Sequence, residues 1–114
     1  MKKHGLPMMM FVAVGFILPL TVTIADEAKR AAPEGQALYK KHCNMCHFPD
    51  KADKKMGPGL KDLLKNTELP LSKKPASVEV VREQINKGSK AMPAFGKKLS
   101  AKEMDALMEY LKTL

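Results

Sequence analysis

The fold of this chain is decided by the segment Cys43-Asn44-Met45-Cys46-His47, which contains its only two cysteines. A Cys-x-x-Cys-His pattern is typical of covalent c-type haem attachment. The spacing has a chemical reason, because two thiols can add across the two vinyl groups on one edge of the porphyrin. The histidine that follows the second cysteine then lies beneath the iron as its proximal ligand. The segment therefore predicts one covalently bound haem c, with its iron, on Cys43, Cys46 and His47.

Two other kinds of site use a similar pattern. A redox-active pair of the thioredoxin type stands in a βαβ unit, which this short chain lacks. A zinc ion takes four ligands, and next to the motif only His42 adds a fourth donor. The haem interpretation is therefore favoured over both alternatives.

The start of the chain predicts export. Lys2 and Lys3 precede an apolar stretch without any charge, residues 6–22, as in the n-region and h-region of a signal peptide. Thr23-Ile24-Ala25 offers small residues at the positions that a signal peptidase reads. We expect a signal peptide over residues 1–25 and a mature haem-binding domain over residues 26–114, located in the periplasm.

An uncleaved membrane anchor is the alternative to cleavage. The apolar stretch reaches the short edge of the ~17–25 residues that span a bilayer. Pro7, Gly15 and Pro19 interrupt it, which favours a cleaved signal.

Length and charge limit the class of protein. A chain of 114 residues allows one small domain and excludes a multidomain enzyme. So small a core needs additional support, such as a cofactor. The 20 basic residues outnumber the 12 acidic ones and give a net charge of +8, which favours acidic partners, membranes or nucleic acid. The chain shows no nucleic-acid recognition motif.

The apolar pattern predicts helices and no sheet. Pro33 suits a first helical position, and a helix from it runs into Cys43. Three leucines, Leu60, Leu63 and Leu64, mark a short helical turn, whereas residues 69–75 form a loop. No segment alternates with a period of two, so the expected fold class is all-α.

Two further helices carry clear end signals. Ser77 is a plausible N-cap for a helix that ends at Gly88. Ser100 and Glu103 fit a capping box. The last helix then carries one apolar stripe, formed by Met104, Leu107, Met108 and Leu111.

The chain resembles the class I cytochromes c, the small monohaem electron carriers of bacterial periplasms, over residues 33–114. The resemblance is carried in order by Gly35-Gln36-Ala37-Leu38-Tyr39, the haem motif, Gly57-Pro58-Gly59-Leu60, Met92-Pro93-Ala94-Phe95 and a final amphipathic helix. It implies a small class I cytochrome c fold with four to five helices around one haem. It also implies that the first and last helices cross at near right angles, with Gly35 and Tyr39 against Leu107, Tyr110 and Leu111.

An electron carrier needs a sixth iron ligand, and Met92 is the leading candidate. It stands in a loop rich in glycine and proline that can present a side chain freely. Met104 and Met108 fit core positions instead. Met56 is the competing candidate, although the family pattern uses the Pro58 region to bind the second nitrogen of the proximal histidine through a backbone carbonyl.

His42 is a less suitable ligand. It directly precedes Cys43, and neighbouring residues on a helix point about 100° apart, so it does not reach the distal side. We expect a solvated surface histidine.

Lysines flank both ligand segments. They are Lys40, Lys41, Lys51, Lys54, Lys55, Lys87, Lys90, Lys97 and Lys98. They would steer a redox partner with an acidic docking face toward the haem edge. The alternative is a surface that only keeps the protein soluble.

Three classes of function remain. The first is a monomeric periplasmic protein that carries one electron on a haem with His47 and Met92 as axial ligands. The second is a haem c subunit of a larger oxidoreductase complex. The third is a haem-based sensor or peroxidase, which requires Met92 to be absent from the iron. No His, Arg or Glu occurs in residues 91–96, so an enzyme in its own right is not expected.

Overall fold

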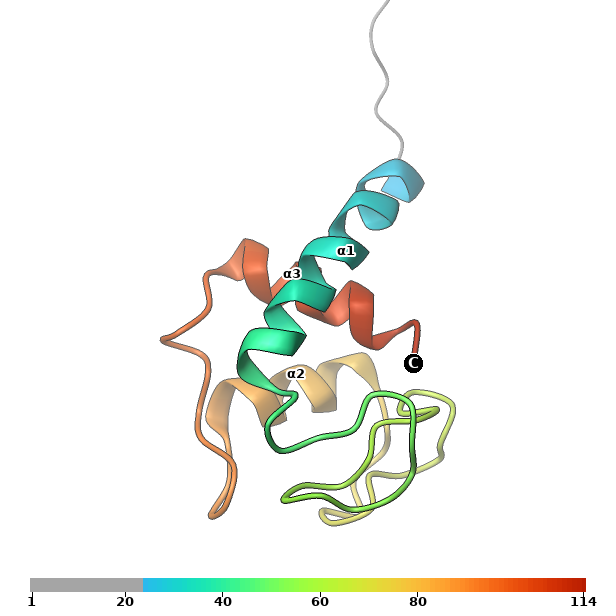
Figure 1. Cartoon of the computed structure of the whole chain (residues 1–114), viewed down its shortest axis with the longest axis vertical. Coiled ribbons are helices and arrows are strands. Elements are labelled where there is room, and N and C mark those ends of the chain that lie inside the picture. Colours follow the sequence, from blue (N-terminus) through green and yellow to red (C-terminus); the bar gives the residue numbers. More distant parts are fainter. Residues whose placement is uncertain (1–23) are drawn as a thin grey trace, which may run out of the picture.

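The structure, a computed structural model, describes residues 24–114 of the chain. These residues form three helices, α1 (Ile24–His42), α2 (Val78–Lys87) and α3 (Ala101–Leu111). Figure 1 shows α1 crossing α3, with α2 and the loops below them. The described part contains no strand, only an isolated bridge between Glu68 and Pro75. The all-α prediction is confirmed, but residues 24–114 form three helices rather than the expected four to five.

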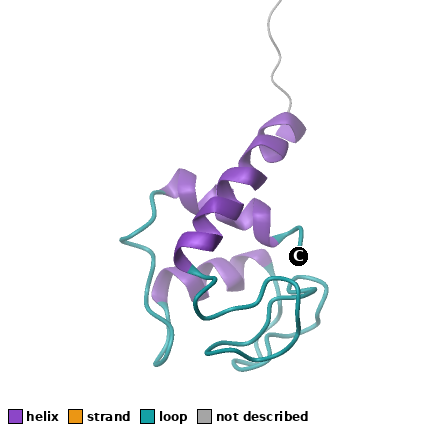
Figure 2. Ribbon diagram, in the orientation of Figure 1, coloured by secondary structure: helices purple, strands orange, loops and turns teal. Residues whose placement is uncertain are grey.

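The predicted helical turn at Leu60 does not grow into a helix. Its hydrogen bonds join Leu63 N to the Leu60 carbonyl (3.1 Å) and Lys65 N to the Asp62 carbonyl (2.9 Å). Asp62 has a φ of 56°, in the left-handed region, which a right-handed helix cannot include. The segment is therefore a pair of tight turns within the long connection from residue 43 to residue 77 (Figure 2).

The first helix begins earlier than expected. It starts at Ile24, and Pro33 lies inside it rather than at its first position. Asp26 and Glu27 stand in its first turn, where the helix dipole favours negative charge, and Arg30 pairs with Asp26 at 3.5 Å. These local interactions support helix before the proline. The greater part of the predicted signal peptide lies outside the described residues, so its cleavage remains a prediction.

The crossing of α1 and α3 depends on a glycine. Gly35 is buried, and a Cβ there would collide with the Ala106 carbonyl and lie 2.8 Å from the Tyr110 Cβ. One turn later, the rings of Tyr39 and Tyr110 pack at 5.4 Å between centroids. The expected contact between the first and last helices is confirmed at Tyr110. Gly35 also faces the backbone of Ala106, a contact that was not expected from the sequence.

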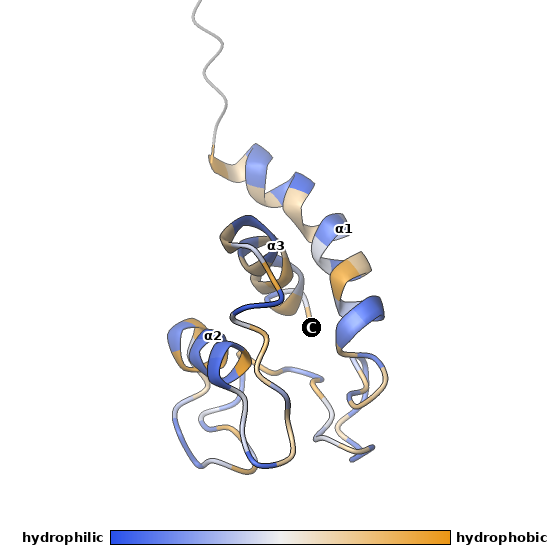
Figure 3. Ribbon diagram, turned by 90° about the vertical axis from the view of Figure 1, so that its left-hand side faces the viewer, coloured by the Kyte–Doolittle hydropathy of each residue, from blue (hydrophilic) through white to orange (hydrophobic). Residues whose placement is uncertain are grey.

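The ends of α2 and α3 form as predicted. The Ser77 hydroxyl accepts from Val80 N, and Gly88 ends α2 with a φ of 66°. Ser100 and Glu103 form a complete capping box at the start of α3. Figure 3 shows that the helices carry both hydrophilic and hydrophobic residues. This is expected where a helix buries one face and exposes the other.

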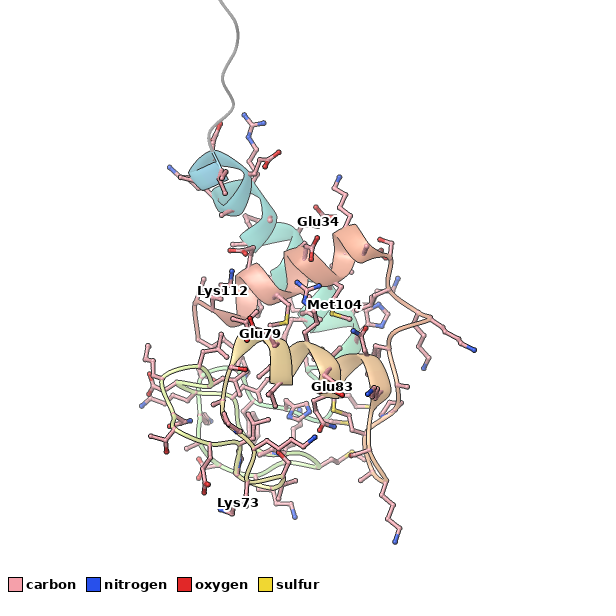
Figure 4. The ribbon with its side chains drawn as sticks, turned by 180° about the vertical axis from the view of Figure 1, so that it is seen from behind. Glu34, Lys73, Glu79, Glu83, Met104 and Lys112 are labelled. Atoms are coloured by element: carbon pink, nitrogen blue, oxygen red, sulfur yellow. The ribbon has the colours of Figure 1, made fainter. Side chains whose placement is uncertain are left out.

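The core lies where the helices meet the loops. Met104, labelled in Figure 4, is 4% exposed, whereas Lys73 lies at the end of the molecule opposite the start of α1. The whole stripe predicted for the last helix is buried. The core consists of Leu38, Tyr39, Leu63, Leu69, Val81, Ile85, Phe95, Leu99, Met104, Ala106, Leu107, Met108 and Leu111.

Candidate haem site

The haem motif continues directly from the end of α1. Cys43 N bonds to the Tyr39 carbonyl at 2.8 Å, as a further helical residue would. The chain then turns, because Cys46 N and His47 N both bond to the Cys43 carbonyl at 3.0 Å. This turn places the two cysteines and the histidine of the motif on one short, hydrogen-bonded segment.

Both cysteines are free thiols and partly buried. Burial, with a smaller contribution from Cys46, raises the pKa of the Cys43 thiol to about 11. Cys43 is therefore a neutral thiol at physiological pH. Two reduced thiols in this spacing are the donor set that thioether attachment to a porphyrin requires.

The imidazole of His47 is held by a backbone carbonyl of the following loop. Its Nδ1 lies 2.7 Å from the Pro58 carbonyl oxygen. A carbonyl can only accept, so Nδ1 carries the hydrogen and Nε2 of the neutral ring keeps a free lone pair. This is the arrangement that orients metal-bound imidazoles, and it is the one expected from the Pro58 region.

Gly57 leaves room for that imidazole. A Cβ at this position would lie 2.8 Å from His47 Nδ1 and 3.0 Å from Nε2. Gly57 N also bonds to the Cys46 carbonyl at 2.7 Å, which ties the loop to the haem motif. The free thiols and the oriented ring fit the attachment of haem.

The loop that carries Met92 is folded back on the end of α2. Ser89 N bonds to the Met92 carbonyl at 2.8 Å, and Phe95 N bonds to the Ile85 carbonyl at 2.9 Å. The Met92 side chain is partly buried against the core, and its sulfur lies 4.0 Å from Gln84 Nε2. Nothing in the sequence pattern pointed to this contact with Gln84.

Met56, the competing candidate, lies in a different environment. It is 71% exposed, and its sulfur lies 3.8 Å from the Cys46 sulfur. Its neighbour Gly57 borders the His47 ring. Met56 therefore lies beside the histidine segment, on the side of the proximal ligand.

His42 differs from the prediction of a solvated surface residue. It is partly buried, and its ring packs edge-on against Phe95 with 5.9 Å between centroids. The last turn of α1 points His42 at the segment that follows Met92, and the apolar Phe95 ring covers one side of it. This contact could not be predicted from the sequence pattern, because the two residues are far apart in the chain.

The nine predicted steering lysines are all exposed, but they are not equivalent. Lys55 donates to the Asn44 carbonyl at 2.7 Å, and Lys87 pairs with Glu83 at 2.6 Å. Lys51 and Lys55 lie over the Phe48 ring. Some of these lysines thus also support the local structure.

None of the helices in residues 24–114 is long and apolar enough to span a membrane. The same residues bring together no group of three or more His, Cys, Asp or Glu side chains that could hold a metal ion.

Comparison with known proteins identifies the family. A family model described as cytochrome C oxidase, cbb3-type, subunit III, matches residues 30–111. Cytochrome c6 of Microcystis aeruginosa is 33% identical over 78 residues, which cover 68% of this chain and 90% of that protein. The residues matched by the family model include the haem motif and the Met92 loop. The chain therefore belongs to the cytochrome c family, as a monohaem class I c-type cytochrome that carries covalently bound haem c.

Proposed function

We propose that this cytochrome is a periplasmic carrier of single electrons, with His47 and Met92 as the axial ligands of its iron. The observation that carries the proposal is the hydrogen bond from His47 Nδ1 to the Pro58 carbonyl. It leaves Nε2 free to bind and fixes its direction. When bound, haem c supplies a one-electron iron couple.

The residues around the haem have separate roles in this proposal. Cys43 and Cys46 fix the porphyrin through thioether bonds, and the Pro58 carbonyl raises the basicity of the His47 ring. Met92 contributes a neutral thioether that stabilises ferrous iron and raises the reduction potential above that of a bis-histidine site. With both axial positions filled, the site changes little between oxidation states and binds no substrate, so we infer no enzymatic activity.

The exposed lysines belong to the same proposal. We infer that they attract a redox protein with an acidic docking face. We also infer a monomeric carrier exported by cleavage of residues 1–25, because the start of the sequence has the charged and apolar regions of a signal peptide. An intact mass of haem plus residues 26–114 in the periplasmic fraction would support cleavage, and a membrane-bound protein that retains Lys2 and Lys3 would contradict it.

The family model favours a second candidate, a haem c subunit of a larger oxidoreductase, because its description names an oxidase subunit. Both candidates use the same haem site. Gel filtration at low ionic strength, followed by identification of copurifying proteins, separates them. A carrier elutes alone, whereas a subunit elutes with its complex.

The optical spectrum of the purified protein tests the axial ligands. We expect haem that resists acid–acetone extraction, the weak near-infrared sulfur-to-iron band in the oxidised state, and slow or no binding of carbon monoxide. A high-spin protein that binds carbon monoxide rapidly would overturn the carrier proposal in favour of a ligand-binding sensor.

A further inference from the structure

The last turn of α1 carries a buried hydroxyl that reaches the haem motif. Tyr39 is 1% exposed, and its hydroxyl donates to the backbone carbonyl of His47 at 2.9 Å. A carbonyl oxygen can only accept, so the Tyr39 hydroxyl is the donor in this bond.

The position of this hydroxyl is set by the packing of two helices. The Tyr39 ring packs against the Tyr110 ring of α3 at 5.4 Å, with 56° between their planes. One turn earlier, Gly35 lets the two backbones approach closely. The ring is thus buried at the contact between α1 and α3, and its hydroxyl has little freedom to leave the His47 carbonyl.

His47 is consequently held at two points by two different parts of the chain. Tyr39 of α1 holds its backbone carbonyl, and Pro58 of the following loop holds its ring nitrogen. A side chain fixed at its backbone and at its ring atom has few rotamers left. The bond to Pro58 orients the ring, and the bond from Tyr39 holds the backbone from which the ring extends.

We propose that Tyr39 is a positioning residue for the proximal histidine, whose hydroxyl transmits the packing of α1 on α3 to the direction of the His47 ring. The inference rests on the proposed role of His47 as iron ligand. It assigns a polar function to a residue that the sequence pattern places only in the apolar core.

Loss of the Tyr39 hydroxyl should weaken the hydrogen bond between the His47 ring and the Pro58 carbonyl. Without its carbonyl anchor, the segment of His47 moves more freely and the bond from Nδ1 to Pro58 weakens. A weaker bond lowers the basicity of the imidazole, which stabilises ferric iron less. The reduction potential should therefore rise, and the Nδ1 hydrogen should exchange faster with solvent.

The test compares Tyr39→Phe with Tyr110→Phe in the holoprotein. Both variants remove one hydroxyl from the same ring pair, but within the described residues only the Tyr39 hydroxyl donates a hydrogen bond. For Tyr39→Phe we expect roughly tenfold faster exchange of the His47 Nδ1 hydrogen in the reduced protein, measured by NMR, together with an upward shift in midpoint potential. Tyr110→Phe should leave both unchanged.

The outcomes separate this inference from the proposed function. If Tyr39→Phe lowers the melting temperature but leaves the exchange rate and the potential equal to those of Tyr110→Phe, Tyr39 is only a packing residue and the inference is wrong. If the wild-type spectrum shows no histidine–methionine ligation, the proposed function fails first, before either variant is compared.

Discussion

At the scale of single residues, the methionines differ in what surrounds their sulfur atoms. Met104 and Met108 are 4% and 1% exposed and fill the core. Met45 and Met56 are 76% and 71% exposed. Met92 is partly buried in a loop outside the helices, so its sulfur is neither committed to core packing nor fully solvated. This environment suits a ligand that must be presented to iron yet protected from water.

Replacing Met92 by Ala should open the sixth coordination position. The near-infrared sulfur-to-iron band should disappear, the midpoint potential should fall, and carbon monoxide should bind rapidly to the reduced protein. The potential falls because a soft thioether stabilises ferrous iron and water does not replace that effect. Absorption spectroscopy and a redox titration measure all three changes.

Met56→Leu is the matched control, because it removes an exposed sulfur beside Cys46 and preserves an apolar side chain. Band, potential and carbon monoxide binding should remain those of the wild type. Loss of the band in Met56→Leu would show that the ligand is assigned to the wrong methionine, while the carrier function would still hold.

The covalent chemistry of the site could be predicted from the sequence, whereas its supporting contacts could not. Cys43, Cys46 and His47 stand in one contiguous motif whose spacing reflects the porphyrin edge. The partners of His47 and His42 come from other parts of the fold. Tyr39 reads as a core aromatic, and only the folded helix end shows its hydroxyl on the His47 carbonyl. Likewise, the ring contact of His42 with Phe95 depends on the path of the Met92 loop.

At the scale of elements, the contact between α1 and α3 depends on the absence of a side chain at Gly35. Gly35→Ala should lower the free energy of unfolding by about 1–3 kcal/mol, because its Cβ would meet the backbone of Ala106, which cannot move aside alone. Gly96→Ala is the control, since a Cβ there would lie 3.0 Å from the Asn86 carbonyl oxygen at an exposed position. Equal losses of stability in denaturant unfolding would contradict this account of the crossing.

The capping box of α3 should make stability depend on pH. The Ser100 backbone N–H donates to the Glu103 carboxylate at 2.8 Å, and this bond holds the pKa of Glu103 below its usual 4.5. A lowered folded pKa means that the contribution is complete above the unfolded pKa and is lost as pH falls through the folded pKa. Glu103→Ala should therefore be less stable than wild type at pH 7, by a margin that shrinks below about pH 4.5.

Glu103→Gln separates the charge from the hydrogen bond. A glutamine at this position can still accept from the Ser100 N–H, so its contribution should not change with pH. Thermal unfolding of both variants between pH 3 and pH 7 provides the measurement. A constant difference between wild type and Glu103→Ala over this range would refute the role of the carboxylate.

Element boundaries could be predicted where a side chain makes the cap itself. At the starts of α2 and α3, the Ser77 hydroxyl and the Ser100 capping box bind backbone N–H groups that have no partner within the helix. Gly88 ends α2. These residue types can be recognised in the sequence because they act on their immediate neighbours. The start of α1 was mispredicted because Pro33 suits a first helical position, whereas in the structure it lies inside a helix that begins at Ile24 and carries Asp26 and Glu27 in its first turn. The turn at Asp62 depends on a left-handed backbone conformation that the leucine spacing does not reveal.

At the scale of the whole molecule, the exposed lysines differ in their position relative to the two ligand segments. The exposed lysines near the two ligand segments include Lys54 and Lys97, which make no hydrogen bond or ion pair within residues 24–114. Lys29 and Lys102, by contrast, lie on the first half of α1 and the first turn of α3. All four carry the same charge, so their effect on a charged reactant depends on position alone. A field concentrated at the haem edge raises association rates, whereas the same charges elsewhere mainly affect solubility.

Reversing Lys54 and Lys97 to Glu should therefore slow oxidation of the reduced protein by ferricyanide, an anionic reactant, by roughly tenfold at low salt. The midpoint potential should change little, because both side chains are solvated and lie in high dielectric. The slowing should fade as ionic strength rises, since the Debye length is only about 10 Å at 0.1 M salt. The control, Lys29→Glu with Lys102→Glu, makes the same change in net charge away from the ligand segments and should slow the reaction less. Stopped-flow rates over a range of salt decide the matter: equal slowing in both double variants would mean that only net charge matters and that these lysines do not define a docking face.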